Sequence, residues 1–475
     1  MTKHHTKTPL TVAIIGGGLS GAAVAYHLAH LTDADITVIE PRADLGRGMA
    51  YATPDPDHRL NVPDHKMTLR SDRPEDFRAW LHSPDAPTLP ANSARLSGEI
   101  YAPRAVFGAY VAAQLQPLLQ EGRLRHLQSK VVSVARASMG QGGRYTLGLS
   151  DSGTLRADII VLATTHPSAG LPRELANLAD DPSLIADPFA EGALASVNPD
   201  ARVLIVGNGL TSADIVASLH RRGHRGKITA LSRHGLRSQP HGPAQPETKA
   251  DFAAHPPRTA LDLLRRARAA VAQDQAMGLT WHAVFDRLRA QGPAIWAALP
   301  EPERRRFLRH LRALWDVHRF RIAPQTYEAN QQMQRLGRLV SLAARIVTAT
   351  PGSPIKLGLQ TRHNGTRLTI AVDRVILATG PAHGSVIKST PALADLAALG
   401  LLQPDPLGLG LLTAASGQAV PGSGSADGSL LVAGPLARAT VGELMGVPEV
   451  ITWAEHIARE VAGQINARRG LVAAQ

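Results

Sequence analysis

The sequence predicts an α/β fold with two Rossmann-like dinucleotide-binding domains, one of them discontinuous, and an inserted α-helical segment. Three observations support this fold class. A short apolar run, a glycine-rich turn and a helical pattern follow one another from Leu10 and again from Arg202. Each of these openings is followed by three further apolar segments, the last of which ends in Ala-Thr. Between these repeats, residues 251–336 have the apolar spacing of amphipathic helices.

Both openings have the pattern of a βαβ unit. Residues 10–15 form an unbroken apolar run ending in glycine, which is typical of a strand buried on both faces of a parallel sheet. Residues 19–31 have helical spacing, and residues 36–40 form the return strand. In the second unit the strand is 203–206, the turn is 207–212 and the return strand is 228–231. Two dinucleotide folds are therefore expected.

The rest of each half repeats the same plan. Gly-Arg-Leu occurs at 122–124 and at 337–339. The predicted strands that follow are 131–134, 145–149 and 158–165 in the first half, and 345–347, 355–359 and 373–380 in the second. A small β-meander and a closing buried strand in each half indicate a duplicated architecture.

The inserted segment is predicted to contain helices at 261–272, 281–290 and 307–315. It interrupts the second half and is large enough to cover a site. Residues 187–199 are expected to link the two halves, and residues 421–428, rich in glycine and serine, to form an exposed loop.

Composition excludes several classes of protein. A chain of 475 residues is long enough for two or three domains and for a large cofactor. The absence of cysteine excludes disulfides, thiolate zinc sites, iron–sulfur ligation and dithiol reductases. The 20 histidines are scattered, with no metal-ligand spacing, so we expect no metal.

The formal charge of +12 raises the question of nucleic-acid binding. The basic residues are mostly arginines spread beside acidic residues, and only 4% of residues are aromatic, so we expect no nucleic-acid partner. A positive field suits an anionic substrate or cofactor phosphates instead. Because no apolar stretch approaches the roughly 20 residues that span a bilayer, we expect no membrane span and a cytoplasmic location. Oligomeric state is not readable from the sequence.

The first glycine-rich turn, Gly16-x-Gly18-Leu-Ser20-Gly21, has a physical reason for each glycine. Gly16 permits the tight turn, Gly18 lets the backbone approach a pyrophosphate, and Gly21 lets the helix pack closely on the strand. The helix N-terminus supplies free N–H groups and positive potential. Glu40 ends the return strand and is expected to accept hydrogen bonds from ribose hydroxyls.

The second turn differs from the first in two ways. In Gly207-x-Gly209-x-x-Ser212 a serine replaces the third glycine, and the return strand ends in Ser232-Arg233 instead of an acid. A carboxylate would repel a 2′-phosphate, whereas Ser232 and Arg233 can bind one, so NADPH is favoured over NADH. If Arg233 is only a surface residue, the sequence does not decide between NADPH and NADH.

The order of these features resembles the two-dinucleotide flavoproteins, which include flavin-containing and N-hydroxylating monooxygenases. Residues 46–51 (GRGMAY), 58–63 (HRLNVP) and 315–324 (WDVHRFRIAP) resemble a narrower group. This group is the bacterial FAD-NAD(P)-binding family, with members similar to FAD-dependent urate hydroxylase and aspartate N-monooxygenase. The resemblance covers nearly the whole chain and implies FAD on the first turn.

The resemblance also implies which residues address the cofactors. The flavin would lie along two loops, the first at 46–51 and the second at 60–62. Val132 would make backbone contacts to the adenine. The chain would return to the flavin at Gly434-Pro435, where it lacks the usual Gly-Asp. A rigid loop packed under the cofactor is the alternative for the first loop. Thr164, Thr379 and Gly380 end the two closing strands and are further candidates. The loop candidates are Arg47, Gly48, Met49, Ala50, Tyr51, Leu60, Asn61 and Val62.

The resemblance and the turns together give a division of the chain. Residues 1–198 are the first part of the FAD-binding domain, and residues 381–475 its C-terminal part. Residues 199–250 and 337–380 form the NAD(P)-binding domain. Residues 251–336 are the helical insertion.

A dense polar cluster, Asp316, His318, Arg319 and Arg321, is predicted in one or two helical turns. His318 and Arg321 share one face and are our candidate catalytic residues, suited to an anionic substrate or a phosphate of NADPH. The alternative is an Asp316–Arg319 pair on a solvated face with His318 buried or capped.

The leading functional hypothesis is a monooxygenase that uses NADPH, FAD and dioxygen to oxygenate a polar or nitrogen-containing small molecule. Two dinucleotide sites, the missing cysteine pair and a helical segment able to exclude water motivate it. The second hypothesis is an NADPH-dependent reductase that passes electrons to a quinone or a protein partner. A non-catalytic flavin-binding protein is the third.

Overall fold

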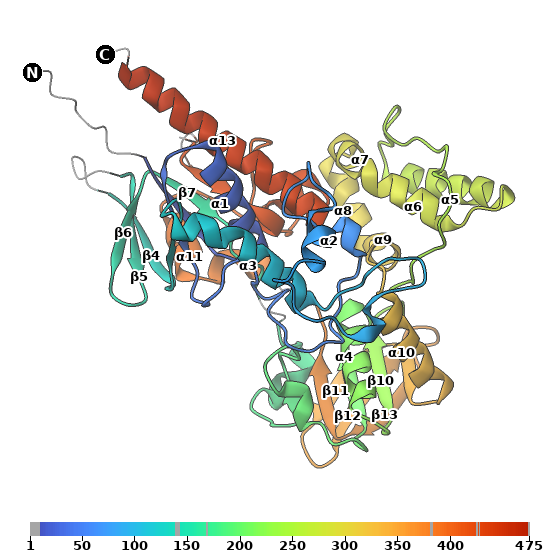
Figure 1. The fold of residues 1–475 in the computed structure, drawn as a ribbon. Helices are drawn as coiled ribbons and strands as arrows, with labels where there is room; N and C mark the ends of the chain where they lie inside the picture. The colour runs from blue at the N-terminus through green and yellow to red at the C-terminus, as the bar shows by residue number, and fades with distance from the viewer. Residues whose placement is uncertain are drawn as a thin grey trace, which may run out of the picture.

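The computed structural model describes residues 10–137, 143–167, 170–380, 383–423, 426 and 428–473. Figure 1 shows two α/β units, with a group of helices beside them and a long C-terminal helix packed along the first unit. The predicted exposed loop at 421–428 lies partly outside the described residues. In the described part of the chain, no helix has the length and apolar character needed to cross a bilayer.

The first unit is a five-stranded sheet in the order β15-β7-β1-β2-β3, in which every neighbouring pair is parallel. Alternate residues of β1 face two different cores, as the two-residue period of a strand requires. Val12 and Ile14 pack with three helices, while Ala13 and Ile15 pack with a small antiparallel sheet and α11. The strands are β1 (Thr11–Ile15), β2 (Asp35–Ile39), β3 (Arg125–Leu127), β7 (Ile159–Leu162) and β15 (Leu430–Val432). The helices are α1 (Leu19–Leu31), α3 (Arg104–Gln120), α11 (Pro391–Ala398) and α13 (Val447–Ala473), and the small sheet is β4 (Val131–Arg136), β5 (Tyr145–Leu149) and β6 (Thr154–Ala157).

The second unit is a seven-stranded sheet in the order β13-β12-β11-β10-β9-β14-β8. Val203 and Ile205 of β9 pack on the side of α4 and α10. Leu204 and Val206 pack on the opposite side, with residues of the antiparallel strands β11, β12 and β13. The strands are β8 (Leu184–Ile185), β9 (Val203–Val206), β10 (Ile228–Ser232), β11 (Leu339–Thr350), β12 (Ile355–Thr361), β13 (Arg367–Val372) and β14 (Arg374–Leu377). The helices are α4 (Leu210–Arg221) and α10 (Pro324–Arg335).

The predicted duplication is confirmed strand by strand. The order β15-β7-β1-β2-β3 matches β8-β14-β9-β10-β11, and the hydrogen bonds that hold the two turns correspond. Gly16 N donates to Ile39 O at 3.0 Å, and Gly207 N donates to Leu231 O at 2.8 Å. One difference is that β3 and β4 are separate in the first unit, whereas their counterpart in the second unit is the single 12-residue strand β11.

The sheet boundaries do not follow the expected division at residue 198. Strand β8 pairs in parallel with β14, so residues 184–185 belong to the second sheet. Leu175 and Leu178 also belong to a core of the second unit. We therefore propose to end the first part of the FAD-binding domain near residue 167.

The inserted segment is helical as predicted, with differences in its bounds. Its helices are α5 (Ala260–Ala276), α6 (Trp281–Ala290), α7 (Gly292–Ala298), α8 (Glu301–His310) and α9 (Arg312–Arg319). The prediction of a single helix over 307–315 is wrong, because the helix is interrupted at Leu311, between α8 and α9. Helix α10 packs on α4 through Met333 and is part of the second unit.

Buried and half-buried ion pairs join the two α/β units. Arg104, the first residue of α3, donates to Asp214 of α4 at 2.6 Å, and both side chains are largely buried. Arg221, the last residue of α4, pairs with Asp55 at 3.0 Å. These contacts attach α4 to the first unit. Because the second turn lies at the N-terminus of α4, they also fix the position of the second turn relative to the first.

Candidate functional site

The first turn has the geometry of a site for a phosphate group. Gly18 is the N-cap of α1, no side chain caps the helix, and its first turn contains no acidic residue. The N–H groups there have no side-chain acceptor, and the helix dipole adds positive potential. Gly16 has a φ of +102°, and a Cβ on Gly21 would lie 1.9 Å from Gly16 O. Gly16 and Gly21 are thus required by the fold, whereas Gly18 faces open space apart from one neighbouring loop.

That neighbouring loop contains Gly48, one of the predicted flavin-loop residues. A Cβ on Gly18 would lie 3.5 Å from Gly48 Cα, and Gly46 N donates to Gly17 O at 2.8 Å. From the other side, Gly434 approaches Ser20 so closely that a Cβ would lie 2.3 Å from Ser20 Oγ. Residues far apart in the sequence therefore meet at one end of α1.

Glu40 lies beside this turn and is 4% exposed. Its Oε2 accepts a hydrogen bond from Gly17 N at 2.9 Å, and its Oε1 accepts from Arg42 at 2.9 Å. A Cβ on Gly17 would lie 2.6 Å from the Cβ of Glu40, so the close packing of acid and turn requires glycine at this position. Oε1 also accepts a hydrogen bond from Arg42 N at 3.1 Å, so Oε2 is the oxygen that retains a lone pair for a ribose hydroxyl.

The second turn repeats this geometry. Gly209 is the N-cap of α4, without a side-chain cap or an acidic residue in the first helical turn. A Cβ on Gly209 would have no neighbour within 4 Å, whereas one on Gly207 would lie 2.3 Å from Ala378 O. Ser212 is 3% exposed and takes the helix position of the third glycine. The second turn is therefore open on the side where a pyrophosphate would lie.

A basic group lies at the end of β10, formed by residues that follow β10 and by Arg362, which follows β12. Arg233 is exposed and has no hydrogen-bond or ion-pair partner among the described residues, while Ser232 Oγ accepts from Gly235 N at 3.0 Å. His234 lies near both Arg233 and Arg362, and its pKa is lowered by burial and then by these two cations. Arg362, which the sequence reasoning missed, adds a second cation where a 2′-phosphate would lie.

Two hydroxyl groups at corresponding positions have no hydrogen-bond partner in the part of the chain that the structure describes. Thr164 follows β7 and Thr379 follows β14, and each is a predicted cofactor residue. Both Oγ1 atoms are buried without a hydrogen-bond partner. A buried hydroxyl without a partner is unfavourable unless a ligand satisfies it. These two atoms lie at the carboxyl ends of the central strands, where dinucleotides bind, so both cradles fit that class of ligand.

The remaining predicted cofactor residues are divided between surface and interior. Met49 is 49% exposed, and Ala50 is exposed beside it. Tyr51 turns inward onto Phe107, with ring centroids 5.0 Å apart, and burial raises its pKa to about 12. The side chain of Tyr51 is therefore part of the core, leaving only its backbone for a cofactor. Arg47 pairs with Asp44 at 2.8 Å.

Val132 lies at an irregularity in the small sheet. The pairing of β4 with β5 shifts between Val131 and Ser133, so Val132 has no partner residue, and its side chain is 42% exposed. Its backbone is thus available for a ligand contact. Pro435 lies in a short 3-10 helix, 434–437, and Gly380 is exposed after β14.

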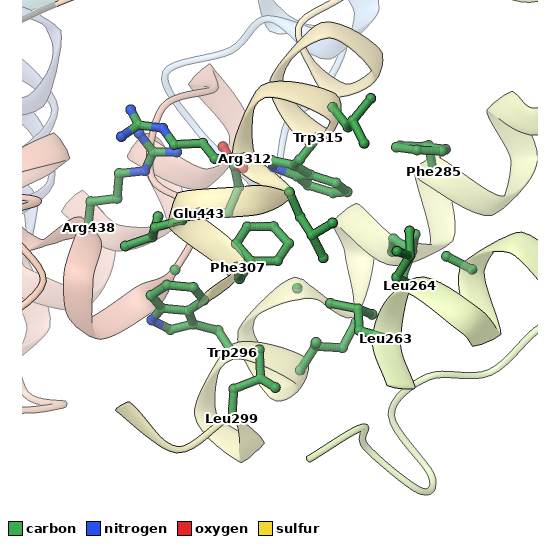
Figure 2. A pocket seen from close by; sticks show the side chains of 18 of the residues that line it. Leu263, Leu264, Phe285, Trp296, Leu299, Phe307, Arg312, Trp315, Arg438 and Glu443 are labelled. Atoms are coloured by element: carbon green, nitrogen blue, oxygen red, sulfur yellow. The ribbon is translucent and has the colours of Figure 1, made fainter. Parts of the chain in front are cut away.

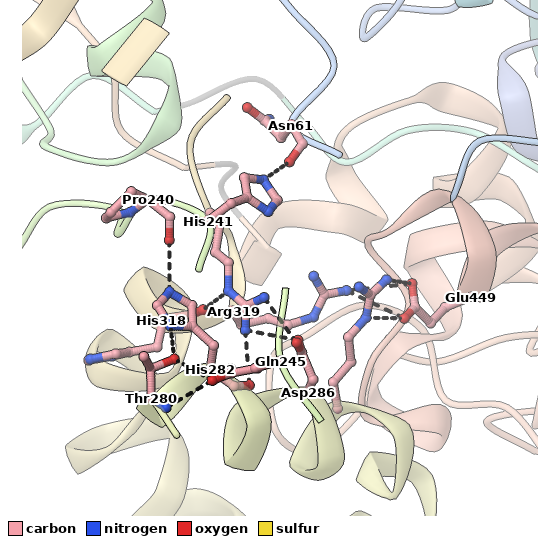
Figure 3. Close-up of polar contacts among 12 residues, drawn as sticks. Asn61, Pro240, His241, Gln245, Thr280, His282, Asp286, His318, Arg319 and Glu449 are labelled. Atoms are coloured by element: carbon pink, nitrogen blue, oxygen red, sulfur yellow. Dashed lines mark hydrogen bonds and ion pairs between the residues drawn. The ribbon is translucent and has the colours of Figure 1, made fainter. Parts of the chain in front are cut away.

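A polar cavity of about 700 Å³ adjoins the second flavin loop. Leu60 is buried, and Asn61 O accepts a hydrogen bond from His241 Nε2 at 2.8 Å, which joins this loop to the segment after β10 (Figure 3). Tyr101 packs on the His241 ring, with centroids 5.5 Å apart. Val62 packs against the first core. The cavity is lined by Pro63, Lys66, Ser97, Glu99, Tyr101, residues 241–247, His282, Ala283, Asp286, Arg287, Ala290 and Arg321.

Burial determines the protonation of His241. Its pKa is lowered to about 4, first by burial and against the opposing effect of its hydrogen bond to Asn61. The imidazole is therefore neutral near pH 7. Because Nε2 faces a carbonyl oxygen, it must carry the proton, which leaves Nδ1 as a hydrogen-bond acceptor.

The structure separates the two predicted catalytic residues. Arg321 lines the polar cavity, pairs with Asp286 at 2.8 Å and lies over the Trp281 ring. His318 does not line this cavity. Its Nδ1 contacts Leu314 O at 2.7 Å, and its ring stacks on Phe285 at 4.7 Å. His318 thus forms part of an aromatic stack, whereas Arg321 faces a site.

The alternative pairing of Asp316 with Arg319 is wrong. Asp316 pairs with Arg312 at 3.4 Å, one helical turn earlier. Arg319 is 8% exposed and reaches the other way, to Glu443 at 3.5 Å and Glu449 at 3.4 Å. Sequence spacing places residues on a helix face but does not identify their partners on other elements.

Two corresponding sheets, each with an uncapped helix behind a glycine turn, define the fold of the two-dinucleotide-binding flavoproteins. In agreement, residues 13–167 match the model of the FAD-NAD(P)-binding family. A search of curated protein sequences gave no match.

Solved structures share this fold over the whole chain. The L-lysine 6-monooxygenase of Pseudomonas syringae has 16% identity and a TM-score of 0.64, over 96% of this chain and 99% of that one. The ornithine N-hydroxylase of Kutzneria sp. 744 has 17% identity and a TM-score of 0.60, over 97% and 100%. The ornithine hydroxylase of Pseudomonas aeruginosa has 18% identity and a TM-score of 0.58, over 96% and 99%.

Proposed function

We propose that this chain holds FAD on the first turn and NADPH on the second, and oxygenates a polar, nitrogen-containing small molecule with dioxygen. The observation that carries the proposal is the position of the polar cavity. It is bounded on one side by Pro63 and Lys66, which follow the predicted flavin loop 60–62, and on the other by residues 241–247, which follow the NADPH-binding strand β10.

The chain's own groups suit the two cofactors. Near the first turn, the α1 amides, Glu40 and the buried Thr164 hydroxyl would hold FAD. Near the second, the α4 amides with Arg233 and Arg362 would hold NADPH. When bound, FAD supplies the electron and oxygen chemistry, and the protein contributes position and shielding.

The charges in the polar cavity favour a zwitterionic substrate. Lys66 has no ion-pair partner among the described residues, and the same is true of Glu99, whose hydrogen-bond partner is Ser97. Both residues line the cavity, and both charges act on His241. Lys66 would bind a carboxylate and Glu99 an ammonium group, which together recognise an amino acid. Arg321, paired with Asp286, would contribute less charge.

Oxygenation is favoured over simple electron transfer for two reasons. The chain has no cysteine, so it cannot pass electrons through a dithiol. The three similar structures reported above are described as lysine and ornithine hydroxylases, which act on amino acids with a side-chain amine. The overall reaction balances if NADPH, a proton, dioxygen and the amine give NADP⁺, water and the hydroxylamine.

The test is a screen of amino acids and small amines with the FAD-loaded protein. A substrate should accelerate NADPH oxidation and gain one oxygen atom, detected by mass spectrometry, with little peroxide released. Lys66→Met and Glu99→Gln should raise the KM for that substrate, while Lys130→Met, an exposed residue of the loop before β4, should not. Peroxide formation at the same rate with every compound, or turnover with a quinone under anaerobic conditions instead, would contradict the proposal.

A further inference from the structure

Helix α6 separates the polar cavity from a second, apolar cavity. His282, Asp286 and Ala290 recur every four residues and face the polar cavity. Phe285 and Leu288 lie on the opposite side and line the apolar one. Since a helix repeats every 3.6 residues, the two sets form opposite faces of α6. The two cavities have no lining residue in common.

The apolar cavity lies among the inserted helices and has a volume of about 130 Å³ (Figure 2). A cavity of about 150 Å³ lined by aliphatic and aromatic side chains takes up a benzene molecule, so this one has room for roughly six carbon atoms. Leu314, in its wall, is 39% exposed, which places part of the wall at the surface. The apolar lining is Leu263, Leu264, Ala267, Phe285, Leu288, Ile295, Trp296, Leu299, Phe307, Leu308, Leu311, Leu314, Trp315 and Leu409.

One end of this apolar cavity is cationic. Arg312, Arg438 and Glu443 are the charged residues of the lining, and Figure 2 shows them gathered on the side away from Leu263, Leu264 and Phe285. Arg438 is only 5% exposed, yet its guanidinium has no hydrogen-bond or ion-pair partner among the described residues. A buried cation without a partner is strongly unfavourable unless an anion approaches it.

The acidic residues nearby are already engaged elsewhere. Asp316 pairs with Arg312 at 3.4 Å, and Glu443 pairs with Arg319 at 3.5 Å. Arg319 also pairs with Glu449, which is shared with Arg289, so four arginines and three carboxylates leave one positive charge without compensation. That charge is on Arg438, which faces the cavity.

We propose that the apolar cavity binds an amphipathic carboxylate, with its carboxylate on Arg438 and Arg312 and an apolar tail of about six carbon atoms among the leucine, phenylalanine and tryptophan side chains. The charge complementarity determines the head group, and the apolar lining with its volume determines the tail. This site is separate from the polar cavity, and the inference stands whether or not the proposed reaction is correct.

The test uses the full-length, FAD-loaded protein and four probes: hexanoate, octanoate, octan-1-ol and octylamine. Binding is measured by calorimetry and by the fluorescence of Trp296 and Trp315, which line the cavity. Octanoate should bind roughly 10- to 100-fold more tightly than octan-1-ol, the ratio expected for a charge-assisted hydrogen bond. Each added methylene from hexanoate to octanoate should tighten binding about fourfold. Octylamine should bind most weakly.

Variants separate the head-group and tail contributions. Arg438→Met should remove the preference for octanoate while octan-1-ol still binds, and Ala267→Phe should abolish binding of both by filling the cavity. Arg309→Met, an exposed change on α8, is the matched control and should bind like the unaltered protein. Equal affinity for octanoate and octan-1-ol, no saturable octanoate binding, or unchanged binding in Ala267→Phe would each overturn the proposal. The proposal would also be overturned if Arg438→Met lost its FAD while Ala267→Phe still bound octanoate like the unaltered protein.

Discussion

Replacing Gly209 by alanine separates the requirements of the fold from those of the electron donor. Gly209 has φ −93° and ψ −155°, a conformation open to any residue, and a Cβ there has no neighbour within 4 Å. The protein alone gives no reason for glycine. The reason we propose is the pyrophosphate of NADPH, which approaches the backbone at this point.

The expected magnitudes differ accordingly. An alanine N-cap in place of glycine costs up to about 1 kcal/mol, and the reduced freedom of the unfolded chain returns about 0.4–1 kcal/mol. Stability should therefore change by less than about 1 kcal/mol. A methyl group that displaces the pyrophosphate loses at least one charge-assisted hydrogen bond, so the Kd for NADPH should rise roughly 10- to 100-fold.

The assay is the rate of flavin reduction as a function of NADPH concentration, with oxygen excluded. Gly209→Ala should keep its FAD and its melting temperature while requiring far more NADPH. Gly463→Ala, an exposed change in α13 whose Cβ also has no neighbour within 4 Å, is the control and should leave the NADPH dependence unchanged. An unaltered NADPH dependence in Gly209→Ala would refute the assignment of the second turn.

Three further predictions concern other parts of the molecule. Arg233→Gln should raise the KM for NADPH about tenfold and leave that for NADH unchanged, because it removes a contact to the 2′-phosphate; equal effects on both would contradict this. Gly21→Ala should destabilise the fold by about 1–3 kcal/mol and weaken FAD binding, since its Cβ would lie 1.9 Å from Gly16 O, and denaturant unfolding would measure it. Burial raises the pKa of Asp214 to about 6, against the opposing charge of Arg104, so the folded protein binds this proton more tightly than the unfolded chain. Stability relative to Asp214→Asn should therefore fall as pH rises from about 4 to 6, and parallel melting-temperature profiles would argue against it.

Local patterns were sufficient to predict the fold and the two turns. The strand, the turn and the helix are adjacent in sequence, and glycine is required at Gly16 and Gly207 by positive φ and close backbone contacts. The repeated segments also predicted the duplicated architecture, because each segment is recognised from its own short-range pattern of apolar and polar residues.

The end of the first part of the FAD-binding domain and the ion-pair partners could not be predicted from local sequence patterns. The two-residue strand β8 is too short to show a period, so its place in the second sheet was missed. The pairs Arg104–Asp214 and Arg319–Glu443 join residues 110 and 124 positions apart, and no sequence spacing predicts them. His318 and Arg321 share a predicted helix face, yet α9 ends at Arg319, so Arg321 lies beyond the helix and lines the polar cavity, whereas His318 stacks on Phe285.

The cavities were likewise outside the reach of sequence. The polar cavity brings Lys66 and Glu99 together with residues 241–247, and only the tertiary fold places these segments side by side. Arg438 was one arginine among many in the sequence. Its importance depends on burial without a partner, which is a property of the packed structure.

The most direct test of the two-cofactor assignment is anaerobic stopped-flow mixing of the purified protein with NADPH. The protein should carry a visible flavin band, and NADPH should bleach it rapidly, with NADH much slower at the same concentration. Gly18→Ala, whose Cβ would lie at ordinary contact distance from Gly48, should fold but lose the flavin band. Absence of a flavin band from the unaltered protein, or a band that NADPH does not bleach, would contradict the account.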